Sequence, residues 1–315
     1  MGSEMCIRDR LWDANTGNPI AVQSPPPLDA YGRPSFGKVV FSPDGSSVAT
    51  RFAERTFIWN IDSGEEIIRL RASDAPAGED PRTTDGLAFH PGGGLLATTQ
   101  NTSSRNPPGA LVWDLTSYQP IDQFSAHTAI VTDVDFSPDG SLLYSASHDG
   151  TIRIWDIEQQ VLVDTFTGHD SEVLSIDVAQ DGTRVASVGA SGALVWNAET
   201  FEVIASLSGH VGPIDSVELS PDGLFAVTAS RADGTAKLWT LAAPTEMMSA
   251  FAPADAGDAS PGGGGALVFD PTGATVTVAQ GAQLISWSFP DGERNAAFPA
   301  PGDQVSELVI DHSGT

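Results

Sequence analysis

The sequence predicts an all-β fold, a β-propeller of four-stranded antiparallel blades. Three observations support this prediction: tryptophans recur at a nearly constant interval, a Pro-Asp-Gly type of turn recurs between them, and short apolar strands flank both. The 315 residues include 32 glycines and 22 prolines, so turns are frequent, which suits short strands better than long helices.

The seven tryptophans set the period of the repeat. Each ends a short apolar segment, and successive tryptophans are 47, 54, 42, 41, 43 and 48 residues apart. A period of about 40–45 residues is what four short strands per blade require. The tryptophans are Trp12, Trp59, Trp113, Trp155, Trp196, Trp239 and Trp287.

In each complete repeat unit, a tight turn precedes the strand that ends in tryptophan. Ser-Pro-Asp-Gly occurs at 42–45, 137–140 and 220–223, with weaker copies at 90–93, 179–182, 270–273 and 311–314. Proline sets φ at the first corner, aspartate bonds the local backbone, and glycine accepts a positive φ. The pattern therefore predicts a hairpin between the first two strands of every unit.

We letter the four strands of a blade a to d, from the central channel outward. The sequence predicts six complete blades, at 37–70, 85–124, 131–166, 172–207, 214–251 and 265–298. Residues 10–23 supply strands c and d of a seventh blade, and residues 305–310 supply its strand a. Because strand b of that blade is missing, we expect a propeller domain over 10–315 that is a fragment, truncated at both ends. Residues 1–9 fit the repeat poorly and are expected to be a non-native or unstructured leader.

Charge and composition exclude several classes of partner. The formal net charge is −26, which phosphate backbones and anionic membrane surfaces repel, so we expect neither nucleic-acid nor membrane binding. No run approaches the ~20 apolar residues of a membrane span. Cys6 is the one cysteine, so no internal disulfide can form. With no signal peptide visible, the cytoplasm is the favoured compartment.

The unit from His127 to Asp156, together with the Gly168-His169 and Gly209-His210 pairs, resembles the WD-repeat family. The resemblance covers roughly 10–315 and is most specific over 125–240. It implies a hydrogen-bond network within each blade, linking a histidine, a strand-b hydroxyl, a turn aspartate and the strand-c tryptophan.

Three blades carry residues for this network. The first set is His127, Ser145, Asp149 and Trp155, with Ser147 as the alternative hydroxyl; the second is His210, Thr228, Asp233 and Trp239. The third set, His169, Ser187 and Trp196, has Ser191 where aspartate is expected.

The histidine, serine and aspartate of the network also suggest a serine hydrolase. The trio recurs blade by blade, and no Gly-x-Ser-x-Gly motif is present, so a structural role is favoured. The sequence has no His-x₃-His pair, P-loop, dinucleotide fingerprint or EF-hand loop. We therefore expect no catalytic, cofactor or metal site.

The resemblance implies a scaffold that binds a protein or peptide, possibly fused in its full-length form to a signalling or regulatory domain. The longer connections, at 24–36, 71–84, 100–109 and 252–264, all fall on the face formed by the d–a and b–c loops. Insertions gathered on one face often mark the binding face. Candidate binding residues there are Tyr31, Arg105, His148, Glu172 and Arg231. The alternative is a propeller enzyme or small-molecule-binding domain with a site at the channel mouth.

Overall fold

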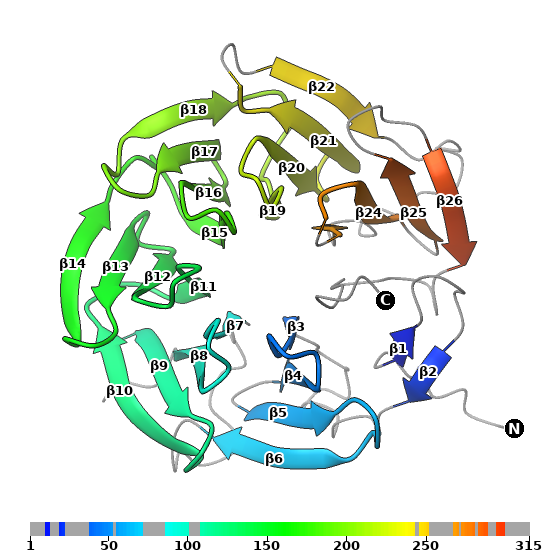
Figure 1. Ribbon diagram of the computed structural model, residues 1–315. Helices are drawn as coiled ribbons and strands as arrows, with labels where there is room; N and C mark the ends of the chain where they lie inside the picture. Colours follow the sequence, from blue (N-terminus) through cyan, green and yellow to red (C-terminus); the bar gives the residue numbers. More distant parts are fainter. Residues whose placement is uncertain are drawn as a thin grey trace, which may run out of the picture.

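Six four-stranded antiparallel sheets lie around a central channel (Figure 1), as the sequence predicts. The computed structural model describes residues 10–12, 19–22, 38–52, 55–71, 86–100, 108–242, 246–251, 267–270, 272–280, 283–288 and 294–299. Every regular element within these ranges is a strand, and none of their segments is a helix long and apolar enough to cross a bilayer.

Each blade consists of four consecutive strands. The strands are β3 (Val39–Phe41), β4 (Ser47–Phe52), β5 (Arg55–Asn60) and β6 (Glu66–Arg71); β7 (Leu87–Phe89), β8 (Leu95–Gln100), β9 (Gly109–Asp114) and β10 (Gln119–Ser125); β11 (Val131–Phe136), β12 (Leu142–Ser147), β13 (Ile152–Asp156) and β14 (Val161–Phe166); β15 (Val173–Val178), β16 (Arg184–Gly189), β17 (Gly192–Asn197) and β18 (Val203–Leu207); β19 (Ser216–Leu219), β20 (Phe225–Ser230), β21 (Thr235–Thr240) and β22 (Glu246–Phe251); β23 (Leu267–Phe269), β24 (Thr275–Gln280), β25 (Gln283–Ser288) and β26 (Arg294–Pro299).

The first strand of every blade lies nearest the channel and the fourth lies on the rim (Figure 1). A two-stranded sheet, β1 (Arg10–Trp12) with β2 (Pro19–Val22), lies between β26 and β6. It holds the predicted strands c and d of the seventh blade. The strand expected at 305–310 and the leader expected at 1–9 lie outside the described residues.

The hydrophobic cores lie between adjacent blades. Trp155 of β13 packs with Ala110, Val112 and Phe124 of the preceding blade, and Trp196 packs with residues of β12 and β13 in the same way. A buried tryptophan removes about 150–250 Å² from water, which contributes about 4–6 kcal/mol at about 25 cal/mol per Å². The recurring tryptophans therefore join each blade to the one before it.

The a–b turns share one backbone geometry. The glycine that ends the turn has a φ between 65° and 75° at Gly45, Gly93, Gly140, Gly182, Gly223 and Gly273, so the weaker sequence copies form the same turn. In the Ser-Pro-Asp-Gly copies, the aspartate accepts a hydrogen bond from the serine hydroxyl at 2.6 Å. The turn chemistry read from the sequence thus sets the hairpin between strands a and b.

Each rim strand carries a β-bulge opposite the tryptophan, which the sequence did not reveal. In β14, Leu162 pairs with Trp155 and Asp164 with Ile154, so Val163 is the extra residue. The equivalent extra residues Ile67, Ile121 and Ile204 are also exposed aliphatic residues. Bulges interrupt the regular pairing edge, which discourages rim strands from pairing with other chains.

Candidate functional site

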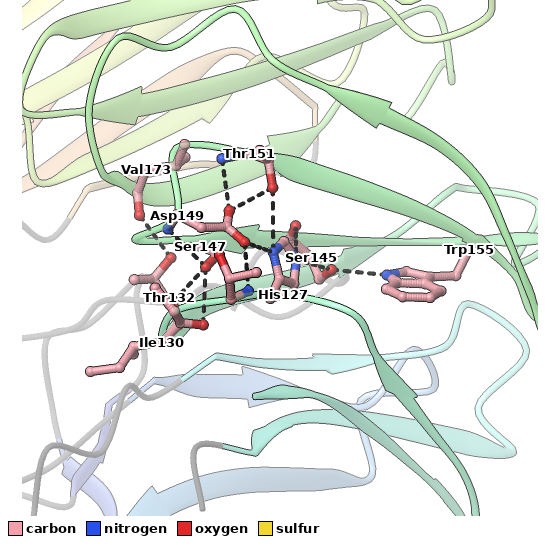
Figure 2. A network of polar contacts seen from close by, with 11 residues as sticks. His127, Ile130, Thr132, Ser145, Ser147, Asp149, Thr151, Trp155 and Val173 are labelled. Atoms are coloured by element: carbon pink, nitrogen blue, oxygen red, sulfur yellow. Dashed lines mark hydrogen bonds and ion pairs between the residues drawn. The ribbon is translucent and has the colours of Figure 1, made fainter. Parts of the chain in front are cut away.

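A chain of hydrogen bonds connects the buried tryptophan of β13 to the loop face (Figure 2). The Trp155 indole Nε1 donates to the Ser145 hydroxyl at 2.9 Å, and that oxygen lies 2.9 Å from His127 Nε2. His127 Nδ1 lies 2.9 Å from an Asp149 carboxylate oxygen. Because the carboxylate only accepts, the proton belongs on Nδ1, and the serine hydroxyl donates to Nε2.

Four separate segments supply these side chains. His127 lies in the loop between β10 and β11, Ser145 on β12, Asp149 in the loop between β12 and β13, and Trp155 on β13. The sequence left two hydroxyls open for the strand-b position, and the structure places Ser145 in it. Ser147 instead donates to the backbone oxygen of Ile130 at 2.9 Å.

The second predicted set has the same arrangement. His210 Nδ1 lies 2.9 Å from Asp233, and its Nε2 lies 2.8 Å from the Thr228 hydroxyl. Trp239 Nε1 donates to that hydroxyl at 2.8 Å. The structure therefore brings together all four residues named in each of the two sets.

The third set is incomplete. His169 Nε2 lies 2.7 Å from the Ser187 hydroxyl, but the buried Nε1 of Trp196 has no hydrogen-bond partner among the described residues. The connection between β16 and β17 is two residues long, Ala190 and Ser191, whereas four residues connect β12 to β13. This shorter connection places no carboxylate in the position that Asp149 occupies.

Burial and hydrogen bonding set the charge of the histidines and the aspartate in these networks. Burial lowers the pKa of His127 and outweighs the Asp149 carboxylate, so the imidazole is neutral near pH 7. Burial lowers the pKa of His169 to about 4. Burial opposes ionisation of Asp149, but hydrogen bonds from Thr151, Thr128 and His127 outweigh it and lower the pKa of Asp149 to about 2.

The trio of His127, Ser145 and Asp149 has the spacing of a serine-hydrolase triad, but its surroundings rule that chemistry out. Ser145 is 0% exposed, and its hydroxyl is already bonded to both the indole and the imidazole. A nucleophile must reach a substrate carbonyl, which this oxygen cannot do. Among the described residues, no group of three or more His, Cys, Asp or Glu could hold a metal ion.

The two complete networks also fix the loop residue that follows the histidine. Asp149 accepts the backbone N–H of Thr128 at 3.0 Å, and Asp233 accepts that of Val211 at 2.9 Å. Val211 is 77% exposed although this hydrogen bond holds its backbone. Sequence reasoning missed Val211, although its position directly after the Gly-His pair could have identified it.

The five predicted binding-face residues have different outcomes. Glu172 and Arg231 are both exposed, and Arg231 donates to Asp215 at 2.8 Å. His148 is only partly exposed. It lies in the compact turn after β12, where its backbone N–H donates to the backbone oxygen of Ile130. Tyr31 and Arg105 lie outside the described residues, as do most of the four long connections predicted for this face.

Comparisons with known proteins agree with this architecture. The family model described as WD domain, G-beta repeat matches residues 118–156, 160–197 and 201–240. Human striatin-4 is 22% identical over 145 residues, which cover 46% of this chain and 18% of striatin-4. The chain thus spans less than a fifth of this curated relative. The three matched segments contain the three histidine networks together with their tryptophans. Six four-stranded blades surround one channel. The chain is a WD-repeat β-propeller protein.

Proposed function

We propose that this propeller is a protein-interaction scaffold that binds a protein or peptide through the face formed by its d–a and b–c loops. WD-repeat propellers are generally interaction scaffolds without enzymatic activity. The observation that carries the proposal is Val211. An exposed apolar side chain on a fixed backbone offers a partner apolar area to bury with little loss of conformational entropy.

The backbone around Val211 is fixed from three directions. Its N–H donates to Asp233, and the next residue, Gly212, has a φ of 110° and packs closely on Ala232. Ile214, three residues after Val211, donates its N–H to the backbone oxygen of Gly189 in the neighbouring blade. A preorganised loop loses little entropy on binding, which favours affinity.

The charges on the neighbouring loops indicate the kind of partner. Asp170 and Glu172 are exposed on the preceding d–a loop, which meets the same Gly189, and Asp215 lies beside Arg231. The whole chain carries a formal charge of −26. These features support a partner segment in which an apolar side chain is flanked by lysine or arginine.

A random-peptide display selection on the purified protein tests this proposal, with selected peptides then synthesised and measured individually. We expect apolar-basic peptides whose affinity falls at least about tenfold, or about 1.4 kcal/mol, when Val211→Asp is introduced. Leu224→Asp is the matched control, because Leu224 is also an exposed aliphatic residue of the same blade but follows its a–b turn. Peptides that lose affinity with Leu224→Asp and not with Val211→Asp would place binding on the opposite face.

Two broader features belong to the same proposal. We propose that the propeller acts within a longer signalling or regulatory protein, supported by the small share of striatin-4 that its match covers. We also propose the cytoplasm as its compartment. The support is that the one cysteine, Cys6, allows no internal disulfide, as is usual for proteins of reducing compartments. A propeller enzyme remains the alternative, and no described residue cluster favours it.

A further inference from the structure

Near the central channel, aspartate carboxylates of one blade accept backbone N–H groups of the next blade. Asp135 of β11 accepts the backbone N–H of Val178 at 3.0 Å, and Asp177 of β15 accepts that of Leu219 at 2.7 Å. Asp133 accepts the N–H of Ile176 at 3.3 Å. These N–H groups point away from the second strand of their own blades, so they would otherwise be unpaired edge donors.

The two inner carboxylates are partly buried and follow one another around the channel. Asp135 and Asp177 each stand one residue before the end of their strand, and Glu218 holds the equivalent position of β19. The cation facing them is Lys38, whose Nζ lies 2.8 Å from Asp133. Tyr144, on β12, carries a buried phenol whose pKa is raised to about 12 by burial and by the charges of Asp135 and Asp139.

Lys38 reaches Asp133 past an intervening blade. Gly86 of that blade packs on the backbone of Asp133, where a Cβ at position 86 would lie 2.8 Å from Asp133 Cα. The positive charge of Lys38 thus acts on three carboxylates, those of Asp133, Asp135 and Asp177. These four described groups together carry a net negative charge when all are ionised.

We propose that Asp135 and Asp177 are proton-dependent clips between successive blades, and that the joints between these blades strengthen when the pair takes up a proton. One proton removes the repulsion between the two carboxylates. The oxygens that remain unprotonated still accept the N–H groups of Val178 and Leu219. The proposal is independent of any partner bound on the loop face.

The direction of titration agrees with this geometry. Burial and then the charge of Asp177 raise the pKa of Asp135 to about 7, and burial raises the pKa of Asp177 to about 6. A carboxyl whose pKa is higher in the folded than in the unfolded chain binds protons preferentially in the fold. Its stabilising contribution is complete below about pH 4 and is lost as the pH rises through about 6–7.

The variant Asp135→Asn tests the clip, because its amide oxygen can still accept the Val178 N–H while the charge is gone. We expect its melting temperature to exceed that of the wild type by about 2–4 °C at pH 8, and this difference to shrink steadily as the pH falls toward 4. Asp164→Asn is the control, since it removes one charge from an exposed site on β14 and should leave this pH dependence unchanged. A pH-independent loss of stability in Asp135→Asn would overturn the proposal.

A second measurement needs no carboxylate variant. In wild-type protein labelled with ¹⁵N-valine and ¹⁵N-leucine, we expect the Val178 and Leu219 amide shifts to titrate between pH 5 and pH 8. Lys38→Met should move their midpoints to higher pH, because Lys38 lowers the pKa of both carboxylates. Amide shifts that stay flat over this range would contradict the clip even if Asp135→Asn failed to fold.

Discussion

At the scale of single residues, the three histidine networks show what each member contributes. Trp155 donates to Ser145, whereas Trp196 is fully buried and has no acceptor in the part of the chain that the structure describes. Trp196 is held instead by stacking on Phe166, with ring centroids 4.6 Å apart and planes inclined by 3°. Packing can therefore keep the indole in place without the hydrogen bond.

This difference predicts unequal effects of the same substitution at the two tryptophans. Trp155→Phe should lower the free energy of unfolding by about 1–2 kcal/mol beyond the change due to ring size, because it removes a buried hydrogen bond. Trp196→Phe should cost less or be stabilising, because a buried donor without an acceptor costs about 1–3 kcal/mol. Urea unfolding of both variants measures the difference, and equal losses would contradict the assigned roles.

The network carboxylates predict the behaviour of the protein in acid. Burial opposes their ionisation, but hydrogen bonds from the loops lower the pKa of Asp149 and of Asp233 to about 2. Each therefore stabilises the fold above its unfolded pKa near 4, and this contribution is lost as the pH falls through about 2. In thermal melts from pH 5 to pH 2, Asp149→Asn should be less stable than the wild type at pH 5. The two proteins should converge toward pH 2, and a constant gap would contradict the prediction.

At the scale of elements, the repeat spacing and turn chemistry were enough to predict the six blades. The tryptophan period located strand c, and the Ser-Pro-Asp-Gly turns located strands a and b, so all six predicted blade ranges agree with the observed sheets. The rim bulges could not be predicted, because a bulge is set by pairing between strands and leaves no turn residue in the sequence. The choice between Ser145 and Ser147 likewise depended on strand register.

Cross-blade contacts were also invisible in the sequence. The Lys38–Asp133 pair joins residues 95 positions apart, and Gly86 of the blade between them packs closely on the Asp133 backbone. Neither residue is marked by a motif, since the repeat pattern describes one blade at a time. The binding-face residue Val211 was overlooked for a related reason: its exposure follows from how the Asp233 carboxylate holds its loop.

Gly86 gives an element-scale prediction with a matched control. A Cβ on Gly86 would lie 2.4 Å from Thr99 Cγ2 and 3.0 Å from Val134 N, whereas a Cβ on Gly94 would meet nothing within 4 Å. Gly86→Ala should therefore destabilise the protein by about 1–3 kcal/mol, and Gly94→Ala should have little effect. Chemical denaturation of the two variants measures this, and equal stability would contradict the close packing of β7 against β11.

At the scale of the whole molecule, the ring has two differently built faces. One carries uniform Ser-Pro-Asp-Gly type turns, and the other carries the loops fixed by the histidine networks. The same buried aspartates that stabilise a blade also position loop residues toward solvent, which links the stability of the fold to the shape of its exposed face. The negative charge of the chain then favours partners with basic segments.

The most direct test of this account compares one selected peptide on two variants of the same blade. Val211→Asp and Leu224→Asp add the same charge to exposed aliphatic positions, one on the d–a loop and one after the a–b turn. The account predicts that Val211→Asp weakens binding at least about tenfold while Leu224→Asp leaves the dissociation constant unchanged. Unchanged binding in Val211→Asp together with a loss in Leu224→Asp would contradict it.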